Sequence, residues 1–207
     1  MTGPLGLYTD LYELTMAAAY HAERTNEPAT FDLFVRSLPP SRDFLVVCGI
    51  ATALDALDRF TFDTDAIDYL RSLAMFDESF LERLAGLRVT GEVWAMAEGE
   101  LVFAGEPLVT ISGPLIEVQL VETLLINLVG VETMVASKAA RVTLAAAGRP
   151  FVDFSARRDH GLDAAVAAAR ASWVAGAVGT SLVEAGRRFG IPVSGTMAHS
   201  YVMAHQT

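Results

Sequence analysis

A single histidine among small polar residues is the strongest candidate for chemistry in this sequence. The stretch Ile191–Ser200 begins with apolar residues, continues through Gly195 and Thr196, and then reaches His199 and Ser200. Glycine permits a positive φ or a close approach of the backbone, and the two hydroxyls flank the imidazole. A histidine at the end of a parallel strand is suited to be a nucleophile or a general acid–base. The alternative interpretation is a structural histidine.

Polar residues also follow two other predicted strands in this part of the chain. The strands cover residues 151–154, residues 175–181 and the stretch that begins at Ile191, and helices are predicted at 162–173 and 182–189. Strands that alternate with helices predict a parallel arrangement, in which the carboxyl ends of the strands meet at one edge. The polar residues at these ends are Arg157, Arg158, Thr180, Ser181, Thr196, His199 and Ser200. Their convergence favours an active site.

The preceding part of the chain predicts a mixed α/β unit without chemistry of its own. Helices are expected at 5–20, 52–60, 65–74 and 78–87, strands at 30–38 and 44–48, and a compact β unit at 88–114. In the first helix, Tyr12 lies off the apolar stripe. It is either a half-buried surface tyrosine or an aromatic platform that stacks on a ligand.

Two further helices are expected within residues 117–147. Apolar residues through Leu128 mark the first, and the second, which includes Met134, carries the only lysine. Lys138 and Arg141 are spaced i, i+3 and therefore point from one helix face. Two adjacent cations suit an anionic ligand such as a diphosphate. The alternative is a solvated basic edge.

Composition excludes several classes of protein. The chain has 207 residues, of which 52% are hydrophobic, enough to bury a sizeable core. The net charge is −10, and without a basic stripe the sequence does not predict a nucleic-acid partner. Cys48 is the only cysteine, which excludes an internal disulfide framework. We find no signal peptide, and apolar runs are interrupted before they reach a membrane span, so a cytoplasmic protein without a membrane partner is expected.

Several of these stretches together resemble nicotinate phosphoribosyltransferases. The stretches are TDLYELTM at 9–16, FDLFVR at 31–36, ETLLIN at 122–127, SKAAR at 137–141, FSARR at 154–158, GTS at 179–181 and GTMAHS at 195–200. They follow the family's order along the whole chain. Each motif is weak alone, but their common order is specific.

The resemblance implies an α/β fold of the type II phosphoribosyltransferase kind. An N-terminal α+β domain, with a helical connection, is expected at residues 1–147. The first strands of an irregular, incomplete α/β barrel are expected at residues 148–207. Family members continue beyond the histidine motif, so this chain resembles the N-terminal portion of such an enzyme. A homodimer is expected, or complementation by a C-terminal half.

The family reaction joins nicotinate to 5-phosphoribosyl-1-diphosphate (PRPP), giving nicotinate mononucleotide and diphosphate, and is coupled to ATP hydrolysis. The resemblance implies that His199 is the catalytic residue that ATP phosphorylates. Mg²⁺ is expected to enter with PRPP and ATP, bound mainly through phosphate oxygens. No dedicated protein metal site is expected.

The resemblance also implies roles for other residues. Arg157 would lie near the nicotinate carboxylate with Arg158 as support, because a guanidinium fork matches a planar carboxylate. Tyr12 would stack on the pyridine ring, in its own site or that of the partner subunit. The predicted phosphate ligands are Lys138 and Arg141, and the predicted contributors to the substrate rim are Thr180, Ser181, Gly195, Thr196 and Ser200.

One departure and two alternatives remain open at this point. Ser155 stands where the family usually has glycine, which predicts a more crowded strand end. The first alternative is a quinolinate-type phosphoribosyltransferase, whose substrate carries an additional carboxylate and should need more cations. The second is a non-catalytic fragment that pairs with a separate second half.

Overall fold

The computed structural model describes residues 3–205. The chain forms two compact units, Met1–Met134 and Val135–Thr207, and the division falls inside the long helix α6 (Glu122–Ala146). The sequence predicted a domain boundary after residue 147. The compact units divide earlier because the C-terminal half of α6 packs with the residues after it and so belongs to the second unit. One such contact is the hydrogen bond that Thr143 Oγ1 donates to the carbonyl of Ala175 at 2.6 Å.

The first unit contains five complete helices within its described residues. They are α1 (Leu11–Ala22), α2 (Ile50–Asp58), α3 (Thr64–Ser72), α4 (Glu78–Ala85) and α5 (Leu115–Leu120). Helix α1 begins later than the predicted residue 5. The N–H groups of Leu5 and Gly6 instead donate to the carbonyls of Arg59 and Thr61, and Tyr8 N donates to the Leu5 carbonyl at 2.8 Å, so a turn stands where the first helical turn was expected.

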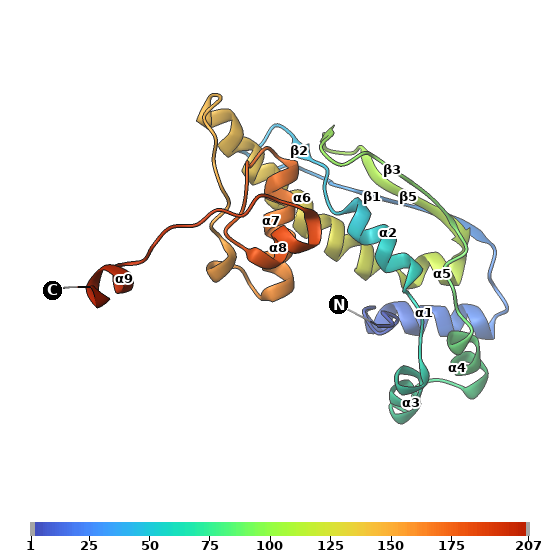
Figure 1. The fold of residues 1–207 in the computed structure, drawn as a ribbon. Helices are drawn as coiled ribbons and strands as arrows, with labels where there is room; N and C mark the ends of the chain where they lie inside the picture. Colours follow the sequence, from blue (N-terminus) through green and yellow to red (C-terminus); the bar gives the residue numbers. More distant parts are fainter. Residues whose placement is uncertain (1–2, 206–207) are drawn as a thin grey trace. The chain divides into compact units, whose positions relative to one another are not determined.

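An antiparallel sheet lies beside these helices in the first unit (Figure 1). Its order is β1 (Pro28–Phe34), β5 (Pro107–Pro114) and β3 (Glu92–Ala95). A second, two-stranded sheet pairs β2 (Leu45–Val46) with β4 (Leu101–Val102). Strands are therefore present within residues 88–114 as predicted, with glycine- and proline-containing turns between them, but they do not form one compact β unit: β3 and β5 pair in the first sheet and β4 pairs with β2 in the second.

The hydrophobic core of the first unit joins the helices to the sheets. Phe60 and Phe80 are fully buried, and the cluster extends from Leu5 to Val129. Full burial of a phenylalanine side chain stabilises a fold by about 1.5–3 kcal/mol. This core holds α1 and the first half of α6 in a fixed arrangement.

Residues 117–147 form two helices, as predicted, but the division between them differs from the prediction. We expected one helix through Leu128 and another from Met134. The structure ends α5 at Leu120 and continues α6 without interruption to Ala146. The helical periodicity of the sequence does not break at residues 129–133, and buried Val129 and Thr133 keep the helix packed there.

Helix α6 is also long and apolar enough, by length and composition alone, to cross a membrane. This is weak evidence, because a core helix passes the same test. In the structure it carries buried residues on one side, among them Glu132 and Ser137. We therefore interpret α6 as a core helix.

The second unit contains three short parallel segments connected by helices. Asp153 pairs with Thr180, and Thr180 pairs with Val193, both in parallel. Helix α7 (Leu162–Val174) connects the first segment to the second, and α8 (Val183–Phe189) connects the second to the third. The predicted alternation is thus present. The segments pair only as isolated bridges, so they are shorter than the predicted strands.

Close packing between α8 and the third segment depends on a glycine. A Cβ atom at Gly186 would lie 2.3 Å from Val193 Cγ2 and 3.0 Å from the carbonyl oxygen of Ile191. Any larger residue would push the third segment away from α8. This contact therefore helps to fix the end of the segment that leads toward His199.

The chain after the third segment differs from the prediction. The sequence placed His199 at a strand end, but the parallel pairing stops at Ser194, whose N–H donates to the Thr180 carbonyl at 3.0 Å. Residues 195–198 are extended, and His199 begins the short helix α9 (His199–Ala204). Figure 1 shows α9 apart from α7 and α8.

Candidate active site

The carboxyl ends of the three parallel segments bring polar residues together in the second unit. A 3₁₀ turn, η1 (Ala156–Arg158), follows the first segment, Ser181 follows the second, and Ser194 lies at the end of the third. We call Arg157, Arg158, Ser181 and Ser194 the strand-end rim. The backbone bonds from Ser181 N to the Asp153 carbonyl (2.8 Å) and from Ser194 N to the Thr180 carbonyl (3.0 Å) hold it together.

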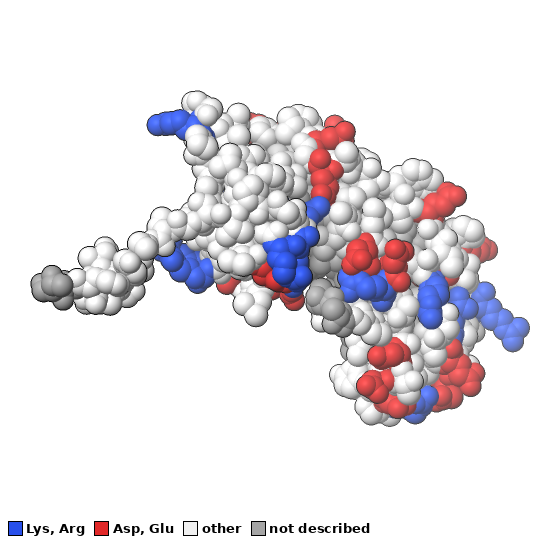
Figure 2. All heavy atoms as spheres, viewed as in Figure 1, with Lys and Arg blue, Asp and Glu red and all other residues white. Residues whose placement is uncertain are grey.

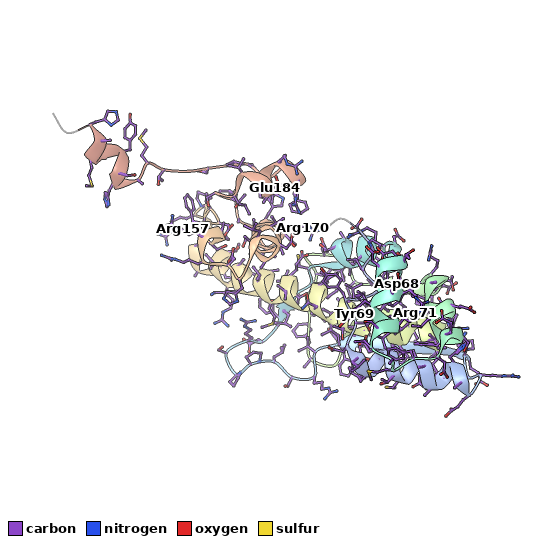
Figure 3. The ribbon with its side chains drawn as sticks, turned by 90° about the horizontal axis from the view of Figure 1, so that it is seen from below. Asp68, Tyr69, Arg71, Arg157, Arg170 and Glu184 are labelled. Atoms are coloured by element: carbon purple, nitrogen blue, oxygen red, sulfur yellow. The ribbon has the colours of Figure 1, made fainter. Side chains whose placement is uncertain are left out.

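The two arginines of the strand-end rim are exposed. Within residues 3–205, neither the Arg157 nor the Arg158 side chain takes part in an ion pair or hydrogen bond. Arg157 belongs to the same unit as Arg170 and Glu184 (Figure 3). By contrast, Arg187 and Arg188 both bind Glu184, at 2.6 and 2.7 Å. Unpaired guanidinium groups at a strand end can receive a carboxylate or a phosphate.

The hydroxyl groups predicted at the second strand end differ in their environment. Thr180 is fully buried, and its Oγ1 donates to Asp153 Oδ2 at 2.9 Å and accepts from Leu182 N at 3.1 Å. Its hydroxyl therefore points into the protein, away from any rim ligand. Ser181 is half-buried and lies at the rim.

Sequence reasoning missed Asp153. Its side chain is only 8% exposed and accepts hydrogen bonds from Thr180 Oγ1 and from Ser155 N. The available signal was a charged residue inside the apolar run Phe151–Phe154. A buried carboxylate requires such partners, so its position in the strand indicated a network.

The residues of the histidine motif are exposed. The motif lies beyond the paired segments and contains Gly195, Thr196, His199 and Ser200. In the described part of the chain, the side chains of Thr196, His199 and Ser200 form no hydrogen bond. Ser200 is the second residue of α9. The motif is thus accessible to solvent.

The predicted phosphate ligands lie on α6. Lys138 and Arg141 are both exposed and are separated by one helical turn, as their spacing predicted. Ser137, the residue before Lys138, is buried. The two cations therefore project from the solvent-facing side of the helix.

Charged residues are mixed over the face of the molecule drawn in Figure 2. Lysine and arginine side chains lie next to aspartate and glutamate there, without a continuous basic stripe. In the first unit, Arg71 of α3 binds Asp68 of the same helix (Figure 3) and Glu78 of α4. This pattern suits small anionic ligands better than a long polyanion.

Tyr12 lies on α1 of the first unit, where it is 46% exposed. Its hydroxyl donates to Glu13 Oε1 at 3.3 Å. Partial burial raises the pKa of the Tyr12 phenol, and the carboxylates of Glu122 and Glu13 raise this pKa further. The ring therefore stays neutral and keeps an exposed face, as a stacking residue requires.

Glu13 fixes α1 against the start of α6. It is fully buried, and its Oε1 accepts from Thr123 N at 3.0 Å and from Thr123 Oγ1 at 2.8 Å. Its other oxygen accepts from the Thr9 hydroxyl. A carboxylate at a helix N-terminus satisfies free N–H groups and interacts favourably with the helix dipole. Glu13 thereby sets the position of Tyr12.

Three groups that could ligate a metal meet in the first unit. Cys48 Sγ and carboxylate oxygens of Glu98 and Glu132 lie within 4.8 Å of one another. Both carboxylates accept hydrogen bonds from the first turn of α2: Ala51 N donates to Glu98 at 3.2 Å, and the Thr52 hydroxyl donates to Glu132 at 2.6 Å. A cysteine sulfur is also a poor ligand for Mg²⁺. We assign no metal to this cluster.

Comparison with known proteins identifies the family. Residues 7–130 match the N-terminal domain model of nicotinate phosphoribosyltransferases, and residues 150–207 match the model of the nicotinate phosphoribosyltransferase family. The chain belongs to the nicotinate phosphoribosyltransferase family. The resemblance found from the sequence motifs is thus confirmed.

Individual relatives agree with this assignment. The chain is 52% identical over 198 residues to the nicotinate phosphoribosyltransferase pncB2 of Mycobacterium tuberculosis, and 42% identical to the Bacillus subtilis nicotinate phosphoribosyltransferase. The alignments cover 96% and 98% of this chain but 43% and 41% of the relatives. The chain therefore spans less than half the length of these relatives.

Solved structures show the same fold. Human nicotinic acid phosphoribosyltransferase has a TM-score of 0.87 and 37% identity, covering 95% of this chain and 40% of the human chain. A Pyrococcus furiosus nicotinate-nucleotide pyrophosphorylase has a TM-score of 0.79 at 22% identity, with coverage of 97% and 44%, and shows the fold alone. The predicted type II phosphoribosyltransferase fold, present as a partial chain, is confirmed.

Loss of the Glu13 carboxylate should destabilise the junction between α1 and α6. The protein for this and later measurements is this chain joined to the remainder of the M. tuberculosis relative, called here the completed enzyme. In Glu13→Ala, the Thr123 N–H loses its acceptor, which costs about 1–3 kcal/mol. We expect a lower melting temperature and faster hydrogen exchange at residues 122–125.

The control for this prediction is Glu23→Ala, because Glu23 is exposed at the C-terminal end of the same helix. It should leave both quantities unchanged. Equal exchange at residues 122–125 in the Glu13→Ala and unmodified proteins would show that Glu13 does not hold this junction.

Proposed function

We propose that this chain carries the substrate-binding half of an ATP-coupled nicotinate phosphoribosyltransferase. The observation that carries the proposal is the strand-end rim, where Arg157 and Arg158 present guanidinium groups that have no partner within residues 3–205. The rim lies within the matched family region at residues 150–207. The relatives named above as nicotinate phosphoribosyltransferases support the choice of substrate.

The reaction requires an anchored pyridine ring and an activated ribose. Arg157 receives the nicotinate carboxylate through a bidentate fork, with Arg158 as support. The pyridine nitrogen then attacks C1′ of PRPP, the C1′–O bond breaks, and diphosphate leaves with the bonding electron pair. Ser181 donates a hydroxyl at the rim, and Tyr12 is proposed as a stacking residue for a pyridine ring because its own ring is 46% exposed.

The phosphates of PRPP need cations. Lys138 and Arg141 supply them from one exposed turn of α6. Mg²⁺ accompanies PRPP and ATP and neutralises phosphate charge, bound through phosphate oxygens. We propose no protein ligand for this ion, because Mg²⁺ that enters with phosphate substrates is bound mainly through phosphate oxygens and water.

ATP coupling is assigned to His199. Its imidazole nitrogen takes the terminal phosphoryl group of ATP, ADP leaves, and water later hydrolyses the N–P bond to regenerate the imidazole. Exposure of His199 at the start of α9 leaves it accessible to ATP. We further propose that the enzyme acts in NAD biosynthesis in the cytoplasm, as a homodimer or after complementation by a second half.

The direct test is formation of the mononucleotide. The completed enzyme, given nicotinate, PRPP, ATP and Mg²⁺, should form nicotinate mononucleotide and diphosphate in equal amounts. Chromatography with mass detection measures both products. Loss of PRPP without a pyridine product would contradict the proposal.

Replacement of Arg157 by lysine should impair nicotinate recognition selectively. Lysine keeps the charge but loses the planar fork. One hydrogen bond to a charged group contributes about 1.5–3 kcal/mol, so KM for nicotinate should rise about tenfold or more. KM for PRPP should change little in steady-state measurements.

The matched control is Arg187→Lys, because Arg187 is exposed in the same unit and bound to Glu184. It should leave both KM values unchanged. Unaltered nicotinate kinetics in Arg157→Lys would remove Arg157 from the nicotinate site.

A further inference from the structure

A buried carboxylate links two of the strand ends that form the rim. Asp153 is 8% exposed, and its two oxygens accept from different elements: Oδ1 from Ser155 N at 3.1 Å and Oδ2 from Thr180 Oγ1 at 2.9 Å. Its backbone carbonyl also accepts from Ser181 N at 2.8 Å. A single residue thus contacts both the first and the second strand end.

The bond to Ser155 sets the direction of the arginine-bearing turn. Once Ser155 N is held by Asp153, the Ser155 carbonyl accepts from Arg158 N at 2.7 Å and closes η1. The Ser155 hydroxyl donates to Asp159 Oδ2 at 3.0 Å, which closes the other side of the turn. Ser155, which stands where the family usually has glycine, therefore contributes a side-chain hydrogen bond that stabilises this turn.

The bond to Thr180 sets the second strand end. Thr180 is fully buried, and its hydroxyl donates its only proton to Asp153 while accepting from Leu182 N at the start of α8. Ser181 lies between these two anchor points. Its place at the rim therefore depends on the Asp153–Thr180 pair.

Only a carboxylate satisfies this arrangement. Both partners, Ser155 N and the Thr180 hydroxyl, donate, so both side-chain oxygens of residue 153 must accept. An asparagine has one acceptor oxygen and one NH₂ group. If its oxygen stays on Ser155 N, its NH₂ faces Thr180, whose hydroxyl must then accept, and the hydroxyl proton loses its buried acceptor. Asp153→Asn therefore removes the acceptor of the Thr180 proton although it preserves shape.

We propose that Asp153 is a positioning residue that sets the Arg157–Arg158 turn and Ser181 in register for the carboxylated ring. The inference rests on the proposed function, since it assigns the rim to nicotinate. It does not place Asp153 in contact with substrate. It explains how a rim made of short, singly bridged segments holds a fixed geometry.

Steady-state kinetics of the completed enzyme test this role. Asp153→Asn should raise KM for nicotinate about tenfold, because a small displacement of a binding group costs affinity steeply, and should leave KM for PRPP within about twofold. Asp58→Asn is the control, since Asp58 is exposed at the end of α2. It should change neither KM.

Variants of Thr180 provide an independent readout if Asp153→Asn does not fold. Thr180→Ser keeps the hydroxyl and should retain the KM for nicotinate, whereas Thr180→Val loses it and should raise this KM as Asp153→Asn does. In the double variant the two effects should add only in part, because both act on the Asp153–Thr180 pair.

Two outcomes would overturn the inference. In the first, Asp153→Asn and Thr180→Val lower the melting temperature but leave KM for nicotinate unchanged, which would make the pair purely structural. In the second, the unmodified completed enzyme forms no nicotinate mononucleotide. That result rejects the proposed function itself and is seen before any variant is made.

Discussion

His199→Ala in the completed enzyme should abolish ATP hydrolysis yet leave part of the transferase activity. PRPP is already an activated donor, so transfer to nicotinate does not require ATP for its chemistry. Removal of the imidazole takes away the phosphoryl acceptor and therefore the coupling. We expect ADP formation to fall to background, while mononucleotide formation continues without a response to ATP.

A chemical signature accompanies this loss. The unmodified completed enzyme, incubated with radiolabelled ATP and Mg²⁺, should acquire a phosphate whose bond is labile in acid and stable in alkali. A phosphate on the neighbouring Ser200 would be stable in acid. Mass spectrometry of the peptide that contains residues 195–204 distinguishes the two sites.

His160→Ala is the matched control. His160 is exposed in the loop after the arginine-bearing turn of the same unit, and its replacement should leave ATP hydrolysis intact. If His199→Ala still hydrolyses ATP in step with product formation, His199 is not the coupling residue and only positions substrate or structure.

The 207-residue chain by itself should have little or no transferase activity. It spans 43% of the M. tuberculosis relative, and its parallel pairing ends at Val193, whose side chain is 52% exposed. An unpaired sheet edge readily associates with other chains. Exposed apolar residues of α9 add to this tendency: Tyr201, Val202 and Met203.

Co-expression tests the prediction about the separate chain. We expect the chain alone to be largely aggregated on size-exclusion chromatography, and co-expression with the remainder of the M. tuberculosis relative to restore solubility and activity. Robust mononucleotide formation by the purified chain alone would contradict this expectation. Persistent inactivity of a soluble, complemented pair would favour a non-catalytic role.

Much of the second unit could be predicted from the sequence because its signals are local. Alternating apolar runs and helical stretches predicted the parallel order in which Asp153, Thr180 and Val193 pair. The spacing of Lys138 and Arg141 predicted a shared helix face, and both are exposed on α6. Each of these predictions depends on periodicity within a few turns or residues.

The missed features depend on contacts between distant residues. The division between α5 and α6 falls at Val121. In the first turn of α6, Thr123 N donates to Glu13 of α1, a residue far away in the sequence. Asp153 looked like an ordinary strand residue until Thr180 was placed beside it. His199 was expected at a strand end, but backbone pairing stops at Ser194. The local pattern marks Asp153 only as a charged residue in an apolar run, and it does not name the partner in any of these long-range contacts.

The central claim is that the rim binds a pyridine with one carboxylate. The most direct measurement offers the completed enzyme PRPP, Mg²⁺ and ATP with equal amounts of nicotinate and quinolinate. Quinolinate gives the same mononucleotide after loss of CO₂. One of the two rings is therefore labelled with a heavy isotope, so that the mass of the product shows which substrate it came from. Our account predicts product that carries the nicotinate mass. Product that carries the quinolinate mass would contradict it.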